Sequence, residues 1–256
     1  GLHPFDWRGF WEYGTGALGD IGCHTLDAPY KTLQLGYPSS VECTATNVFK
    51  KMWTPEYTPE GCPISSMVTL QYDNSPHNKD GIKLIWMDGG LTPTIPEEIE
   101  EEFIMNYDAG NSSGIMMLGS KGVITAEIYA NNPTLYIKGE KPVVFDTSKQ
   151  PNVNDVHAST WTEACKAGFN SSEHKALTSS FDYSGPFTES VIMGNLALRS
   201  RDLRKVTGTR GNGRKIMSYY GRKKLLWDGE NMKIKNLEEA NAFVSKEYRK
   251  GWELPI

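Results

Sequence analysis

The period of the apolar residues changes along this chain, and this change constrains its fold more than any other feature. Apolar and polar side chains alternate, as in half-buried strands, over residues 41–47, 66–72 and 82–86. We expect further short strands over residues 134–138 and 143–145. Residues 114–127 have the pattern of a hairpin around a Ser-Lys-Gly turn. Because most links between these segments are short turns, we expect the strands to pair antiparallel.

Helical patterns flank and follow this strand-rich region. We expect helices over residues 17–35, 155–167, 187–204 and 237–248, and further short strands over 224–227 and 232–234. Pro29 should kink or split the first helix, whereas Pro186 should lie near the first turn of the third. The residues expected to face inward from the second helix are Val156, Thr160, Trp161, Ala164 and Cys165. Residues 50–63 and 88–100 should be loops, and the acidic run that begins at Glu97 should be a solvated face.

The fold class that these patterns predict is α+β, in one domain over residues 1–256. Its sheet should be largely antiparallel and open, with the helices packed on one face. The other face then needs a cover, and we expect a partner subunit of a homo-oligomer to provide it. The residues expected on that open face are Val68, Leu70, Leu84 and Trp86.

Composition excludes several classes of protein. The 256 residues are 38% hydrophobic, which is enough to bury a sizeable core. A net charge of −4 argues against a general nucleic-acid binder, which needs a basic face to displace phosphate counterions. No run reaches the roughly 18 apolar residues of a membrane-spanning helix. The four cysteines form no C-x-x-C motif, so we expect free thiols and no metal site. The compartment stays open between cytoplasm and periplasm.

The clearest candidate for chemistry is a carboxylate–imidazole pair in a glycine-rich segment. Asp20 and His24 are four residues apart, so on a helix they share a face, one turn apart. Asp27 follows three residues after His24 and is also within reach of the ring. A carboxylate favours the protonated imidazole and orients it, and such a pair can transfer a proton to or from a substrate hydroxyl. The alternative is a chance pairing on a purely structural helix.

The glycine-rich segment and several later motifs resemble one oxidoreductase family. After an aromatic-arginine approach at Trp7-Arg8, residues 14–27 follow the pattern G-x-G-x-x-G-D-x-x-x-H-x-x-D. Later matches are L-G-Y-P-S-S-V at 35–41, L-G-S-K-G at 118–122, P-F-T-E-S-V-I-M-G-N-L-A at 186–197, L-W-D-G at 226–229 and Y-R-K-G-W at 248–252. The ordered set covers nearly the whole chain. It resembles the C-terminal domain of the glucose–fructose oxidoreductase, inositol dehydrogenase and MocA family.

The resemblance implies the substrate-binding and oligomerisation domain of an NAD- or NADP-dependent oxidoreductase acting on a sugar, polyol or glycoside. It also implies the C-terminal fold of a two-domain dehydrogenase like glyceraldehyde-3-phosphate dehydrogenase. In that family, the residues matching Asp20 and His24 are catalytic. They work with a lysine in a Glu-Lys-Pro motif of an N-terminal Rossmann domain, which holds the dinucleotide. The residues that would then contact the sugar are Arg8, Trp7, Trp11, Tyr13 and Asp27, with core or interface packing as the alternative for the aromatic rings.

This sequence departs from the family because the dinucleotide-binding half is missing. Residues 14–19 spell G-x-G-x-x-G, but no predicted strand precedes them, and a dinucleotide fingerprint requires a β-α-β unit. Glu140-Lys141-Pro142 spells the family tripeptide but falls between short strands, so we interpret it as a turn. We therefore expect neither NAD nor NADP to bind this chain. Because the chain opens at Gly1 without an initiator methionine, we expect an upstream region.

Two other functions stay open on the sequence. One is a non-catalytic carbohydrate-binding or assembly domain. The other is an NAD-dependent glycosidase that acts through transient oxidation of the sugar. An upstream coding sequence with a Rossmann unit and its Glu-Lys-Pro motif would favour an enzyme, whereas its absence would favour a binding module.

Overall fold

The computed structural model describes residues 3–99, 113–149 and 153–253, with side chains from residue 156 onward in the last range. The chain divides into two compact units. Unit 1 comprises Gly1–Thr94 and Glu189–Ile256, and unit 2 comprises Ile95–Thr188. The sequence predicts a single domain, which requires the two units to fold together. That stays a prediction.

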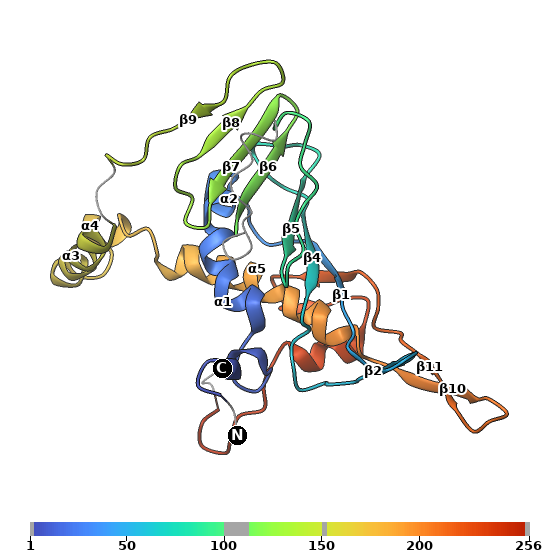
Figure 1. The fold of residues 1–256 in the computed structure, drawn as a ribbon. Coiled ribbons are helices and arrows are strands. Elements are labelled where there is room, and N and C mark those ends of the chain that lie inside the picture. Colours follow the sequence, from blue (N-terminus) through green and yellow to red (C-terminus); the bar gives the residue numbers. More distant parts are fainter. Residues whose placement is uncertain (1–2, 100–112, 150–152, 254–256) are drawn as a thin grey trace. The chain divides into compact units, whose positions relative to one another are not determined.

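Unit 1 is built on a five-stranded sheet with the order β13-β12-β1-β4-β5 (Figure 1). Its strands are β1 Ser40–Ala45, β4 Ser66–Tyr72, β5 Ile82–Met87, β12 Leu225–Asp228 and β13 Lys233–Ile234. Every neighbouring pair is antiparallel, and Thr69 at the middle of β4 lies opposite Glu42 on one side and Ile85 on the other. Unit 1 is therefore α+β with an open antiparallel sheet, as the sequence predicts.

The first predicted helix is split, but not at the proline. α1 (Gly16–Thr25) ends at Leu26, and α2 (Asp27–Thr32) begins directly after it. Pro29 lies in the first turn of α2, where a backbone N–H has no intrahelical partner to lose. The proline therefore starts the second helix instead of breaking the first.

Helices cover one face of the unit 1 sheet. The second half of α5 (Phe181–Ser200) packs on the sheet so closely that a Cβ added at Gly194 would lie 3.0 Å from Val68 Cγ1. Val68 and Leu70, with Leu84 and Trp86 on the next strand, are all buried. The expectation that these four residues form the open face is therefore wrong. Strand alternation leaves their neighbours, such as Ile85, on the exposed face instead.

Unit 2 contains a four-stranded antiparallel sheet with the order β6-β7-β8-β9. Its strands are β6 Gly114–Gly119, β7 Gly122–Glu127, β8 Thr134–Tyr136 and β9 Val143–Val144. The predicted hairpin over residues 114–127 is confirmed. Ile99, Val123 and Tyr136 form a small core, and Lys138 pairs with Glu97 at 2.9 Å. Most of the acidic run that follows Glu97 lies outside the described residues.

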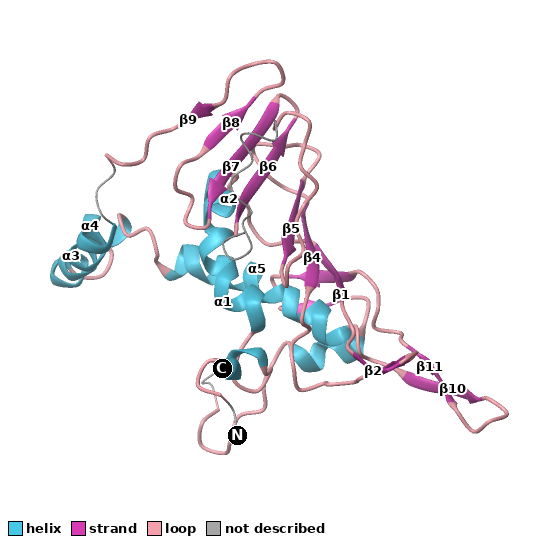
Figure 2. Cartoon of the chain, in the orientation of Figure 1, coloured by secondary structure: helices cyan, strands magenta, loops and turns pink. Residues whose placement is uncertain are grey.

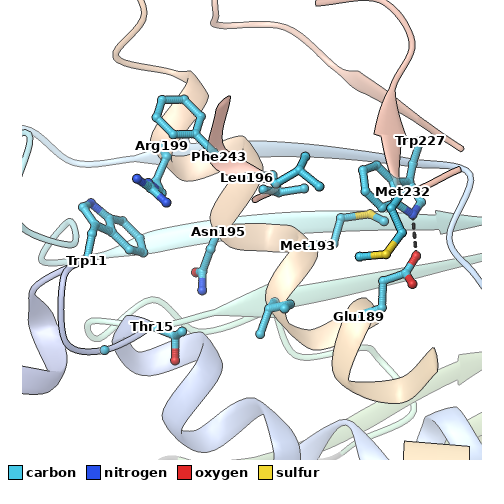
Figure 3. Close-up of a pocket in the computed structure, with 13 residues that line it drawn as sticks. Trp11, Thr15, Glu189, Met193, Asn195, Leu196, Arg199, Trp227, Met232 and Phe243 are labelled. Atoms are coloured by element: carbon cyan, nitrogen blue, oxygen red, sulfur yellow. Dashed lines mark hydrogen bonds between the residues drawn. The ribbon is translucent and has the colours of Figure 1, made fainter. Parts of the chain in front are cut away.

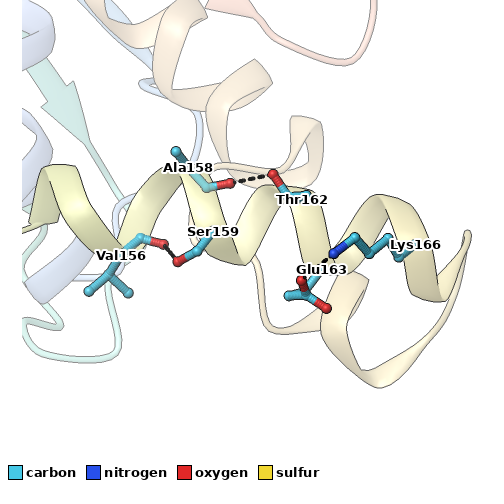
Figure 4. Close-up of polar contacts among 6 residues, drawn as sticks. All are labelled: Val156, Ala158, Ser159, Thr162, Glu163 and Lys166. Atoms are coloured by element: carbon cyan, nitrogen blue, oxygen red, sulfur yellow. Dashed lines mark hydrogen bonds and ion pairs between the residues drawn. The ribbon is translucent and has the colours of Figure 1, made fainter.

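The second predicted helix is present as α3 (Val153–Ala167), but its expected inward face is wrong. Of the five residues assigned to that face, only Ala164 is buried, and Trp161 is 62% exposed. Polar side chains bond within the helix itself (Figure 4): Ser159 Oγ donates to the Val156 carbonyl, and Lys166 Nζ lies 2.8 Å from Glu163 Oε1. Because α3 has so few apolar residues, its polar side chains can form their hydrogen bonds with solvent and with the backbone of the helix itself. It is followed by a short α4 (Ser172–Lys175).

Several local elements differ from the sequence-based expectations. α5 begins at Phe181, so Pro186 lies inside the helix and not near its first turn. A 3₁₀ helix, η3 (Glu238–Phe243), replaces most of the expected closing helix. Other elements were absent from the expectations, and Figure 2 labels four of them, α4, β2, β10 and β11. The full set is η1 Asp6–Gly9, α4 Ser172–Lys175, β2 Phe49–Lys51, β3 Thr54–Pro55, β10 Lys205–Thr209 and β11 Lys215–Ser218. Within the described residues, none of the helices combines the length and apolarity needed to cross a bilayer.

Candidate functional site

The glycines before and inside α1 are explained by close packing. A Cβ at Gly14 would lie 2.4 Å from the carbonyl oxygen of Arg8, so only glycine lets the chain turn back over that residue. Gly16 has φ +66°, and its missing side chain makes room for the thiol of Cys62. Gly22 packs against Val191 of α5. The Cβ positions of these three glycines are thus taken up by neighbouring atoms of the chain.

The turn at Gly14 brings Arg8 to α1. Arg8 Nε lies 3.5 Å from Asp20 Oδ1, and the guanidinium carbon lies 4.5 Å from the centre of the Phe5 ring and 5.6 Å from that of Trp7. The side chains of Arg8 and Asp20 are 38% and 39% exposed, so solvent screens the pair. Such a pair stabilises the fold by about 0.2–1 kcal/mol, and its main effect is to position the loop.

His24 lies one turn after Asp20 on the same face of α1, and its side chain is exposed. Asp27 is half-buried at the start of α2. His24 and Asp27 both interact with other described residues. We call the group formed by Trp7, Arg8, Asp20 and His24 the α1 surface.

The loop that carries Arg8 is tied to a distant part of the chain. Phe10 forms an isolated antiparallel bridge with Gly61. The Cys62 amide donates to the Gly9 carbonyl at 2.7 Å, and the Trp11 amide donates to the Glu60 carbonyl at 2.9 Å. These bonds fix the backbone on both sides of Phe10, so the α1 surface is held by contacts far apart in sequence.

A second feature of unit 1 is a pocket of about 170 Å³ along α5, which we call the α5 pocket (Figure 3). It is bounded by the loop before α1, by one side of α5, and by segments near β12, β13 and η3. Its lining residues are Trp11, Gly14, Thr15, Glu189, Ile192, Met193, Asn195, Leu196, Arg199, Trp227, Met232, Phe243 and Val244. Most of these side chains are apolar or aromatic, and the polar groups are few, as in many small-molecule sites.

The α5 pocket contains only one of the residues predicted from the sequence as a site. Trp11 lines it, whereas Trp7, Arg8, Asp20, His24 and Asp27 do not. Tyr13 is also absent from the lining, and its side chain is 58% exposed.

The polar residues of the α5 pocket were missed by sequence reasoning. At one end, Trp227 Nε1 donates to Glu189 Oε1 at 2.5 Å, and burial raises the pKa of the Glu189 carboxyl above its usual value. Toward the other end, Asn195 and Arg199 stand one turn apart on α5. Their i,i+4 spacing on a predicted helix was the available signal, but the opposing wall comes from residues far away in sequence.

The described residues do not fit a dinucleotide. The segment before the G-x-G-x-x-G pattern is a 3₁₀ helix and a turn, not the strand that a dinucleotide fingerprint requires. Arg8, Cys62 and Thr15 lie close to the Cβ positions of its three glycines. Among all residues that the structure describes, no three His, Cys, Asp or Glu side chains are grouped so that they could hold a metal ion.

Comparison with the models of known protein families and with the sequences of curated proteins finds no match to this chain.

Proposed function

We propose that this chain is the substrate-binding domain of an NAD- or NADP-dependent oxidoreductase that acts on a sugar, polyol or glycoside. The dinucleotide would belong to a separate upstream domain. The proposal rests on the motif resemblance together with one structural observation, the contact between Arg8 and Asp20. That contact brings Arg8 to Asp20, one turn before His24 on α1, and the Trp7 ring lies 5.6 Å from the Arg8 guanidinium carbon.

The α1 surface has the groups that carbohydrate chemistry needs. The Arg8 guanidinium offers N–H donors to sugar hydroxyls, and the Trp7 ring offers an apolar face for sugar C–H groups. His24 would accept a hydroxyl proton as the hydroxyl carbon is oxidised, and Asp20 would stabilise the resulting imidazolium. Because Arg8 also pairs with Asp20, it links sugar binding to the position of that carboxylate.

The test of this role uses the protein encoded with its upstream region. We expect His24→Ala to reduce kcat about 10²–10⁴-fold, because a proton-transfer group is lost. Dinucleotide affinity, measured separately by titration, should change little. His77→Ala is the matched control, since His77 is an exposed histidine outside the α1 surface, and it should leave kcat unchanged. If kcat of His24→Ala stays within about threefold of wild type, the catalytic role is wrong.

A second test addresses the cofactor. We expect the 256-residue chain alone not to bind NAD or NADH, because the glycine-rich segment is packed against its own chain. Calorimetric titration measures this directly. Micromolar affinity of this chain for NAD or NADH would contradict the proposal that a separate upstream domain holds the dinucleotide.

A non-catalytic binding or assembly domain is the second candidate. It is favoured by aromatic side chains in unit 2 that face solvent, among them Phe181 at 91% and Phe169 at 84% exposure. An upstream sequence without a Rossmann unit, combined with sugar binding and no turnover, would select this candidate.

A further inference from the structure

A largely buried polar side chain lines the α5 pocket. Asn195 is 7% exposed, and its Oδ1 atom is closed to solvent and has no hydrogen-bond partner among the described residues. Figure 3 shows the carboxamide projecting from α5 toward Thr15, at the start of α1. Because Oδ1 is closed to solvent, a ligand in the pocket would meet the carboxamide at its Nδ2 group, which donates hydrogen bonds.

Arg199, one turn farther along α5, is a cation in the lining of the pocket that can bind an anion. Its guanidinium carbon lies 4.5 Å from the centre of the Phe243 ring and 5.9 Å from that of Trp11. No carboxylate of the described chain forms an ion pair with it, and the nearby Glu12 is paired with Lys246 at 3.4 Å. Burial lowers the pKa of the guanidinium, as expected for a cation partly removed from water.

The start of α1 adds to the positive character of this end of the pocket. Thr15 is the N-cap of this ten-residue helix, and its side chain makes no capping hydrogen bond. Thr15 and Gly14 both line the pocket, so the N-terminal end of the α1 dipole borders it. Arg199, the end of α1 and the Asn195 carboxamide thus all line one space.

We propose that the α5 pocket binds a small sugar acid, a cyclic carboxylate that carries hydroxyl groups. The carboxylate accepts hydrogen bonds from Arg199, and a hydroxyl oxygen accepts one from Asn195 Nδ2. The apolar face of the ring packs on the aromatic wall that includes Trp11. At about 170 Å³ the pocket is smaller than the roughly 300–1,000 Å³ of drug-sized sites, which limits the occupant to about one monosaccharide. This site is separate from the α1 surface and does not depend on Asp20 or His24.

The experiment is calorimetric titration of the 256-residue chain with glucuronate, with neutral glucose as the matched ligand. We expect glucuronate to bind saturably and glucose to bind at least about tenfold more weakly, because a hydrogen bond to a charged group is lost. Arg199→Met keeps the apolar stem and should weaken glucuronate binding about tenfold to a hundredfold. Arg214→Met removes an exposed arginine of unit 1 that lies outside both the α1 surface and the α5 pocket, and it should leave glucuronate affinity unchanged.

A folding control keeps the test decisive. Arg199→Lys retains the charge and the stem, and far-UV circular dichroism with a thermal melt shows whether each variant is folded. If Arg199→Met is unfolded, the folded Arg199→Lys variant decides, and it should bind more weakly because a lysine cannot form the bidentate contact. Equal binding of glucose and glucuronate, no saturable binding, or loss of binding in Arg214→Met would each overturn the proposal. None of these outcomes concerns Asp20 or His24, so the proposed function would stand.

Discussion

Two of the four cysteine thiols are held where ionisation is unfavourable. Burial raises the pKa of the Cys43 thiol to about 11, despite the opposing effect of Arg201. Burial likewise raises the pKa of Cys62 to about 12, and the negative charge of Asp88 adds to the shift. Because the thiolate is the reactive form, both side chains should be inert near neutral pH.

Alkylation should therefore divide the cysteines into two pairs. With iodoacetamide at about pH 7.5, we expect Cys23 and Cys165, which are exposed, to be modified first. Cys43 and Cys62 should react only after denaturation. Peptide mapping by mass spectrometry reads out each site, and early modification of Cys43 or Cys62 in folded protein would contradict the burial described here.

The same shifts predict a loss of stability in alkali. Below about pH 9 the thiols are protonated in both folded and unfolded chains, so they do not affect the unfolding equilibrium. As the pH rises from about 9 toward 11, the unfolded chain releases these protons while the folded chain keeps them, and the free energy of unfolding falls. Replacing Cys43 and Cys62 by alanine should reduce this fall in urea titrations. The control pair, Cys23→Ala with Cys165→Ala, should not change it.

At the level of elements, the contact between α5 and α1 has no spare room. A Cβ at Gly194 would lie 2.2 Å from Leu18 Cδ2, and Leu18 is itself buried. Gly194→Ala should lower the free energy of unfolding by about 1–3 kcal/mol, although alanine is the better helix former. Gly36→Ala is the control, because nothing lies within 4 Å of a Cβ there, and it should change stability by less than about 0.5 kcal/mol.

A double-mutant cycle separates overpacking from other causes. Leu18→Ala alone should cost about 2–5 kcal/mol through the cavity that it creates. Combined with Gly194→Ala, its cost should fall, because the new methyl group occupies part of that cavity. Strictly additive costs in urea unfolding would show that Gly194 and Leu18 are not coupled.

How far the sequence predicts these elements depends on which contacts decide them. β4 matches its predicted range because strict alternation on a strand flanked by two others places every second residue in the core. The inward face of α3 could not be predicted, because a helical period says nothing about whether another element packs on it. The hairpin of β10 and β11 was missed because its strands are exposed and lysine-containing, without an apolar alternation.

The same distinction between local patterns and contacts with distant segments applies to the candidate site. The shared face of Asp20 and His24 follows from local spacing alone. The pairing of Arg8 with Asp20 depends on a turn that only Gly14 permits, and the α5 pocket depends on segments that begin near Trp11 and end near Phe243. Contacts between residues so far apart in the chain produce no pattern that can be recognised in a single sequence.

For the whole molecule, the exposed face of the unit 1 sheet predicts self-association. Ile85 is 47% exposed and Leu226 41% exposed, each on a strand whose opposite side is buried. We expect light scattering at increasing concentration to reach twice the chain mass. Ile85→Lys should return the mass to that of one chain, whereas Phe169→Lys, at an exposed site in unit 2, should not. A wild-type protein that stays monomeric at high concentration would contradict this interface.

The segment between Trp7 and Thr15 is shared by the two sites of unit 1. Its first residues belong to the α1 surface and its last residues line the α5 pocket, with Phe10 bridged to Gly61 between them. Because backbone hydrogen bonds to residues 60–62 hold this segment, a substitution that breaks them should disturb both sites together.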